Sequence, residues 1–185
     1  STEYLKDWGL TSMNASTAYA LGFNGSGVKI GVMDSGVLLN HPEFQDGRIH
    51  VVKTEGTYSK DGMRYPDASV GNGPINKNEP VKNGKRNFDK TDNGVFTKGE
   101  AFNIDGAWHK YTNDAHGTHV GGTMAASRDG NEMHGVAFGA NLYSANTGGN
   151  DNMTYGPNQD YSFFLQGYSA LADAGAKEIG RASCR

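Results

Sequence analysis

The apolar residues of this chain form two short runs that are typical of buried strands. Residues 28–33 (Val-Lys-Ile-Gly-Val-Met) are mostly β-branched and apolar, and the run ends at the charged Asp34. Residues 142–145 (Leu-Tyr-Ser-Ala) have a similar character and follow a glycine-containing turn. Short apolar runs bounded by turn signals predict strands that are covered on both faces of a parallel sheet.

Other segments have the spacing or the composition of helices. Residues 161–176 carry apolar side chains at intervals of three and four, which predicts an amphipathic helix. Residues 117–127 contain only small or medium-sized side chains, as a helix packed closely against a sheet requires. A short helix over residues 16–21, stopped by Gly22, is expected before the first strand.

A long polar segment separates the first strand from the small-residue helix. From about residue 40 to 112 the sequence is dominated by Asn, Gly, Lys and Asp, with Arg48 to Thr54 as the best strand candidate. We interpret residues 45–112 as a long, mostly surface insertion with one or two short strands. Loops of this length inside compact domains are usually functional or mobile. The chain order is therefore strand, excursion, helix, strand and helix, which is an α/β pattern.

The last eight residues do not continue this pattern. A turn at residues 174–177 should lead into an apolar strand, but only Ile179 fits one. One reverse translation of Glu178–Arg185 reads like a common short-read sequencing adapter. We therefore expect residues 178–185 to be a non-native tail that includes the sole cysteine, Cys184. Because the later strands of the sheet would then be missing, we expect the strand near residues 142–145 to have an open edge.

Composition and charge narrow the choice of partners. The 185 residues include 17 Lys+Arg and 20 Asp+Glu, a net charge of −3, so a broad basic surface for nucleic acid is not expected. No apolar run approaches the ~20 residues needed to span a bilayer, and we expect no membrane contact from this segment. A single cysteine excludes an internal disulfide.

Two short motifs carry candidate chemistry. Asp34 stands at the end of the first strand in Val-Met-Asp-Ser-Gly, and His116 opens the small-residue helix in His-Gly-Thr-His-Val-Gly-Gly. A buried carboxylate that accepts a hydrogen bond from one imidazole nitrogen fixes the tautomer, so that the other nitrogen can take a proton from a hydroxyl nucleophile. These motifs predict that Asp34 and His116 form an acid–base pair.

The two motifs, in this order, resemble those of the subtilisin-like serine proteases, whose catalytic triad runs Asp, His, Ser along the chain. The segments 8–10, 25–28, 41–44 (His-Pro-Glu-Phe) and 134–138 resemble the same family. The likeness extends from Trp8 to about Lys177. The resemblance implies a doubly wound, mainly parallel sheet with helices on both faces, here truncated, and it implies that residues 1–177 are the N-terminal part of a catalytic domain.

The resemblance also implies roles for individual residues. Asp34 would orient His116, and His116 would be the general base. The family's nucleophile lies in a Gly-Thr-Ser-Met-Ala motif that this chain lacks, and Thr11-Ser-Met13 matches only three of its letters. We therefore expect the whole protein to be a serine endopeptidase and this segment, taken alone, to be inactive. The sequence does not indicate the substrate-binding residues.

The family likeness further implies a protein or peptide substrate and a secreted or bacterial cell-surface location. Within the family, residues 133–138 and the insertion rich in Asn and Gly most resemble the autotransporter-type subtilases of Gram-negative bacteria.

Alternatives remain open at this point. The chain could be a non-catalytic binding module on a subtilase-like fold, or a metal-dependent hydrolase that uses Asp114, His116 and His119. We expect no metal and no cofactor, although calcium is possible in the loop at residues 129–132 together with Glu43. The other histidines are expected to be surface or capping residues: His41, His50, His109 and His134.

Overall fold

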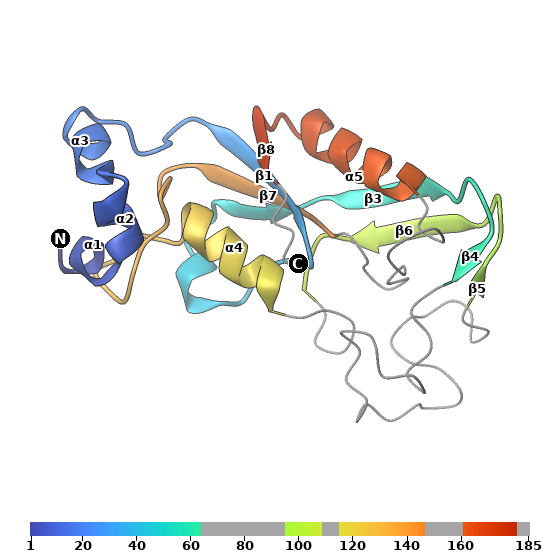
Figure 1. Ribbon diagram of the computed structural model, residues 1–185, viewed down its shortest axis with the longest axis horizontal. Coiled ribbons are helices and arrows are strands. Elements are labelled where there is room, and N and C mark those ends of the chain that lie inside the picture. Colours follow the sequence, from blue (N-terminus) through green and yellow to red (C-terminus); the bar gives the residue numbers. More distant parts are fainter. Residues whose placement is uncertain (64–94, 109–114, 147–160, 181–185) are drawn as a thin grey trace, which may run out of the picture.

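The computed structural model describes residues 1–63, 95–108, 115–146 and 161–180. At its centre is a parallel four-stranded sheet with the strand order β2-β7-β1-β8 (Figure 1). The strands span Lys29–Asp34 (β1), Ile49–Val51 (β2), Asn141–Asn146 (β7) and Glu178–Gly180 (β8). The two predicted strands therefore form and lie side by side, with Ile30 opposite Leu142 in the register.

Helices cover both faces of this sheet. Helix α4 (His116–Ala125) lies on one face and α5 (Tyr161–Asp173) on the other (Figure 1). Successive side chains of a strand point to opposite faces, so β1 contributes Ile30 and Val32 to the core beneath α4 and Met33 to the core beneath α5. The α/β fold with helices on both faces is confirmed.

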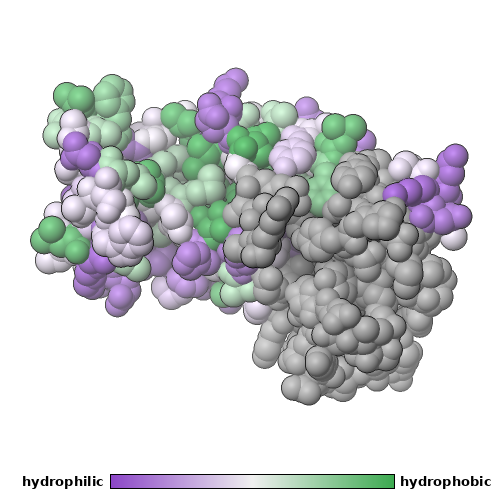
Figure 2. Space-filling view, in the orientation of Figure 1, coloured by the Kyte–Doolittle hydropathy of each residue, from purple (hydrophilic) through white to green (hydrophobic). Residues whose placement is uncertain are grey.

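Three short helices precede the sheet, namely α1 (Thr2–Lys6), α2 (Trp8–Ser12) and α3 (Ala15–Ala20). The predicted helix corresponds to α3, and the chain turns after it at Gly22, whose φ of 88° favours glycine. Leu10 and Ala15 are buried, while the exposed apolar side chains of this region are Leu5, Trp8, Met13, Leu21 and Phe23. Figure 2 shows hydrophobic residues gathered at this end of the molecule.

The insertion is more than a surface loop. After the short 3-10 turn η1 (Pro42–Phe44) and β2, its strands β3 (Lys53–Thr57) and β6 (Ala101–Asp105) form an antiparallel ribbon, and β4 (Gly62–Met63) pairs with β5 (Val95–Phe96). The strand expected over residues 48–54 is therefore divided between the main sheet and the ribbon. Residues 64–94 and 109–112 of the insertion lie outside the described residues.

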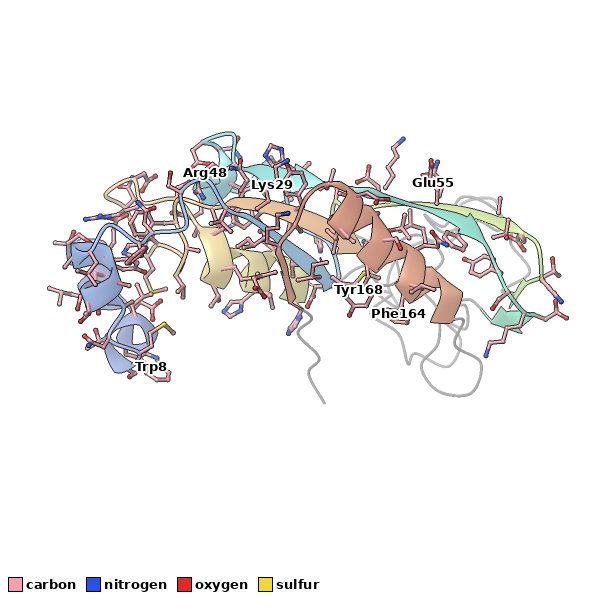
Figure 3. The ribbon with its side chains drawn as sticks, turned by 90° about the horizontal axis from the view of Figure 1, so that it is seen from above. Trp8, Lys29, Arg48, Glu55, Phe164 and Tyr168 are labelled. Atoms are coloured by element: carbon pink, nitrogen blue, oxygen red, sulfur yellow. The ribbon has the colours of Figure 1, made fainter. Side chains whose placement is uncertain are left out.

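The ribbon extends the core beneath α5. Tyr58, Phe102 and Ile104 are each at most 2% exposed and pack with Leu171 of α5. Figure 3 shows Phe164 and Tyr168 on α5, and both belong to or contact this cluster. The expectation of a mostly surface segment is thus wrong for the ribbon, because its alternating apolar positions were too few to be recognised among the polar residues.

Two further expectations need correction. Strand β7 does not have an open edge, because it pairs with β2 on one side and with β1 on the other. The α/β pattern also continues past residue 178, because Glu178–Gly180 pairs in parallel with β1. In this strand Ile179 is half-buried, and the residues on either side of it are exposed. Backbone groups make a strand ladder, so one apolar side chain is sufficient here. The non-native origin of residues 178–185 stays a prediction.

In the described part of the chain, no helix combines the length and the apolar character required to cross a membrane.

We expect Leu171→Ala and Leu165→Ala to separate the buried and exposed faces of α5. Leu171 is 0% exposed and Leu165 is 65% exposed. Removing the buried side chain should cost about 2–5 kcal/mol of unfolding free energy, through lost burial and a cavity. The exposed substitution should stay within about 0.5 kcal/mol of the parent. Urea unfolding measures both, and equal losses would show that α5 does not pack as described.

Candidate active site

Asp34 lies at the carboxyl end of the central strand β1. Its side chain is 3% exposed, and its Oδ1 atom accepts a hydrogen bond of 2.7 Å from the backbone N–H of Ser35. The carboxyl ends of parallel strands are where open α/β sheets assemble their sites. The fold thus delivers a buried carboxylate to the edge of the sheet where chemistry is expected.

His116 is the first residue of α4 and faces that carboxylate. Its Nδ1 atom lies 2.8 Å from Oδ1 and 3.0 Å from Oδ2 of Asp34. An ionised carboxylate can only accept, so Nδ1 is the donor, and in a neutral imidazole the lone pair is then on Nε2. The His116 side chain is 29% exposed. The structure therefore brings together the two residues that the sequence singles out.

The close approach of α4 to the end of β1 depends on glycine. A Cβ atom at Gly117 would lie 2.5 Å from the backbone oxygen of Gly36, and one at Gly121 would lie 3.1 Å from a methyl carbon of Val37. Real side-chain atoms cannot occupy the first of these positions. The run of small residues therefore has the function expected of it, which is to let the helix lie directly on the strand end.

Polar contacts between the turn after Asp34 and α4 reinforce this arrangement. The residue before α4, Ala115, makes no side-chain cap, but the Oγ atom of Ser35 accepts a hydrogen bond of 2.8 Å from the N–H of Gly117. The N–H of Leu38 donates to Oγ1 of Thr118 at 3.0 Å. Neither hydroxyl contact was expected from the sequence, in which only the position of Ser35 directly after Asp34 could have indicated its role.

The C-terminal end of the insertion contacts the turn that follows Asp34. The N–H of Val37 donates to the carbonyl of Gly106 at 3.2 Å, and the N–H of Trp108 donates to the carbonyl of Val37 at 2.8 Å. Asn146, which is fully buried at the end of β7, donates through Nδ2 to the carbonyl of Ala107 at 3.3 Å. Residues 106–108 thus lie against the turn that follows Asp34, which the sequence did not indicate.

The loop considered for calcium, residues 129–132, forms hydrogen bonds with α1 and within itself. The N–H of Gly130 donates to Oε1 of Glu3 at 2.9 Å, and the N–H of Asn131 donates to Oδ1 of Asp129 at 2.9 Å. Within the part of the chain that the structure describes, no three His, Cys, Asp or Glu side chains form a group that could hold a metal ion. Calcium binding therefore stays an untested expectation.

Glu43 is the electrostatically unusual member of this region. Its Oε2 atom is buried and has no hydrogen-bond partner. Burial raises the pKa of the Glu43 carboxyl, and the negative charges of Asp129, Glu3 and Glu132 raise it further. The ionised form of Glu43 is thus unfavourable in the folded protein.

Three of the remaining histidines make contacts in other parts of the described chain. His41 caps η1 by accepting from the N–H of Glu43 at 3.2 Å, as expected of a capping residue, and His50 stacks on Tyr143 with ring centroids 4.7 Å apart. His134 differs from expectation, because it is 3% exposed and lies among aromatic rings. His109 lies outside the described residues.

The alternative metal centre does not assemble among the described residues. Asp114 lies outside them, and Nδ1 of His116 is engaged by Asp34. His119 lines a cavity of about 620 Å³ between α4, η1 and residues 132–134. The side chains of His119 and His116 are therefore in different surroundings, although they are only three positions apart on the helix.

Comparisons with known proteins agree with this geometry. A family model described as the subtilase family, Peptidase S8, matches residues 25–163. The chain belongs to the subtilase family. It is 33% identical over 144 residues to an extracellular serine protease of Serratia marcescens, covering 77% of this chain and 9% of that protein.

Two further relatives are also longer than this chain. The chain is 31% identical over 135 residues to bacillopeptidase F of Bacillus subtilis, covering 72% of this chain and 7% of the relative. It is 26% identical over 144 residues to subtilisin BL of Lederbergia lenta, covering 78% of this chain and 34% of the relative. The chain thus spans about a tenth of the length of the first relatives and about a third of the last.

We expect opposite effects from alanine at two glycines of α4. Gly117→Ala places a Cβ against the backbone of Gly36 and should destabilise the fold by about 1–3 kcal/mol through overpacking. Gly122→Ala meets nothing within 4 Å and should stabilise the helix by about 0.5–1 kcal/mol. Thermal unfolding of both variants measures the difference. Shifts of the same sign would contradict the described contact between α4 and the turn.

We also expect Glu43→Gln to change how stability depends on pH. Because the pKa of Glu43 is raised on folding, its stabilising contribution is complete below the ordinary carboxyl pKa of 4.5 and is lost as pH rises through the folded value. The Gln variant, which cannot ionise, should therefore melt at a higher temperature than the parent at neutral pH, with a difference that shrinks toward pH 4.

Glu55→Gln is the matched control, since it removes the same charge from an exposed position of β3. Melting curves from pH 4 to 8 compare the three proteins. If the melting temperatures of Glu43→Gln and the parent differ by the same amount at every pH, ionisation of Glu43 does not destabilise the folded protein.

Proposed function

We propose that this chain supplies the orienting carboxylate, Asp34, and the general base, His116, of a subtilisin-type serine endopeptidase. The observation that supports this most strongly is the contact of His116 Nδ1 with both carboxylate oxygens of Asp34, at 2.8 and 3.0 Å. Membership of the subtilase family and the names of its serine protease relatives support the same reaction.

In the proposed reaction a serine hydroxyl attacks the carbonyl carbon of a peptide bond. His116 takes the hydroxyl proton on Nε2 and then gives it to the departing amine. Asp34 holds the Nδ1–H tautomer and stabilises the imidazolium that forms in between. In the second half, His116 activates a water molecule that releases the acyl group from the serine.

We propose that the nucleophile comes from outside this sequence. The 185 residues contain no Gly-Thr-Ser-Met-Ala motif. Ser12, within the partial match at residues 11–13, lies exposed in α2 among the N-terminal helices. We therefore propose that residues 1–177 are the N-terminal part of a catalytic domain, and that the segment alone does not hydrolyse peptides.

The proposed substrate is a protein or peptide, and the proposed location of the enzyme is outside the cell. The second part rests on the relatives from Serratia marcescens, which are named extracellular. A cell-surface, autotransporter-type arrangement is the narrower form of this proposal, and it rests on the sequence resemblance alone.

The test requires the natural protein that contains these residues. Its peptidase activity should fall about 10⁶-fold in kcat with His116→Ala and about 10⁴-fold with Asp34→Asn, because the general base and its orientation are lost. His119→Ala, on the same helix, should retain the catalytic pair and most of the kcat. The isolated 185-residue chain should show no hydrolysis above that of its own His116→Ala variant.

Activity that is independent of His116 in the natural protein would overturn the proposal. Protein binding without any peptidase activity would indicate a binding module, and loss of activity with a chelator together with stoichiometric zinc would indicate a metal-dependent hydrolase.

A further inference from the structure

Helix α4, which carries His116, lacks a side-chain cap at its N-terminal end, while at its C-terminal end the N–H of Ala126 donates to the carbonyl of Gly122. The residue before it, Ala115, makes no side-chain hydrogen bond to the helix, and the last turn contains no basic residue. The first four N–H groups and the last four carbonyls of any helix lack partners within the helix. In α4, some of these groups are satisfied by residues from other elements.

Arg48 takes this role at the C-terminal end. It lies in the loop before β2 (Figure 3), and its guanidinium donates from Nη2 to the carbonyl of Ala125, the last residue of α4, at 3.0 Å. It also donates from Nη1 to the carbonyl of Ala140, directly before β7, at 2.7 Å. A cation at a helix C-terminus is also favoured by the helix dipole.

A carboxylate and a hydroxyl hold the guanidinium in place. Arg48 Nε donates to Oδ2 of Asp46 at 2.7 Å, and Ser127 Oγ lies 2.8 Å from the same oxygen. Burial would raise the pKa of Asp46, but the hydrogen bonds from Ser127 and Arg48 outweigh it and lower the pKa. The Arg48 side chain is only 17% exposed, so the planar group is fixed from several sides.

The packing of α4 against the sheet makes such end contacts important. Its buried positions are Gly117, Gly121 and Ala125, which have little or no side chain. The partly buried Val120 and Met124 also pack against the core, but the fully buried positions offer few projections that would resist sliding of the helix along its own axis. Polar contacts therefore help to fix the axial position of α4, from Ser35 to Gly117 at one end and from Arg48 to Ala125 at the other. At the C-terminal end, the N–H groups of Val136 and Ala137 also donate to carbonyls of the last turn, those of Thr123 and Met124.

We propose that Arg48 is a positioning residue for His116. The ten residues of α4 form a rod about 15 Å long, so a displacement of its C-terminal end is transmitted to its first residue. By fixing Ala125, Arg48 keeps the imidazole of His116 within hydrogen-bond distance of Asp34. This inference rests on the proposed function only in giving the Asp34–His116 contact a role in catalysis.

The test uses the 185-residue chain and the NMR resonance of the imidazole Nδ1 proton of His116. A short hydrogen bond to a carboxylate moves this resonance downfield, and Asp34→Asn identifies it by removing the charge. In Arg48→Ala the resonance should shift upfield or be lost through faster exchange with water. Arg48→Lys, which keeps the charge but donates from one nitrogen, should show a smaller change.

Arg128→Ala is the matched control, because Arg128 follows α4 closely but stacks over Phe138, 5.2 Å from the ring centroid. It should leave the resonance unchanged. All variants are compared while folded, as judged by their amide spectra. If Arg48→Ala does not fold, Arg48→Lys decides: a lower melting temperature with an unchanged imidazole resonance would overturn the proposal, since Arg48 would then be structural only.

The outcomes separate the two proposals. A parent chain with no downfield resonance that depends on Asp34 would contradict the pairing on which the proposed function rests. A normal resonance in the parent that persists in Arg48→Ala would contradict the role of Arg48 alone.

Discussion

The structure depends on the direct contact between the backbone of α4 and the turn that follows β1. Gly117 lies so close to Gly36 that no side chain fits between them, and this distance places His116 against Asp34. The turn is in contact with Gly106 and Trp108 on its other side. A buried carboxylate requires satisfied hydrogen bonds, and Asp34 accepts them from the adjacent N–H of Ser35 and from His116 of α4.

Much of the fold could be predicted from local patterns. The apolar run before Asp34, the small residues after His116 and the spacing of apolar positions in α5 each indicate a specific element, and all three form. The pairing of Asp34 with His116 required more than a pattern. It was expected because two motifs of one family occurred in the right order.

The rest depends on interactions that leave little trace in the sequence. Ser35, Arg48 and Asn146 act on backbone groups of other segments, and the choice of those partners is set by the tertiary structure. Strand β8 formed although only one of its residues is apolar, because a neighbouring strand supplied the partners for its backbone. The ribbon was missed because its buried residues are separated by polar ones.

The way the insertion is attached has a consequence for changes in its length. Near the two ends of the insertion, Lys53–Thr57 pairs with Ala101–Asp105. Next to this ladder, Tyr58 and Phe102 pack in the core beneath α5. The ladder closes the chain between Thr57 and Ala101, and the entropy cost of such a closure grows only slowly with the length of chain that it encloses. The protein can therefore acquire or shed sequence there over evolutionary time while the geometry of Asp34 and His116 is inherited intact.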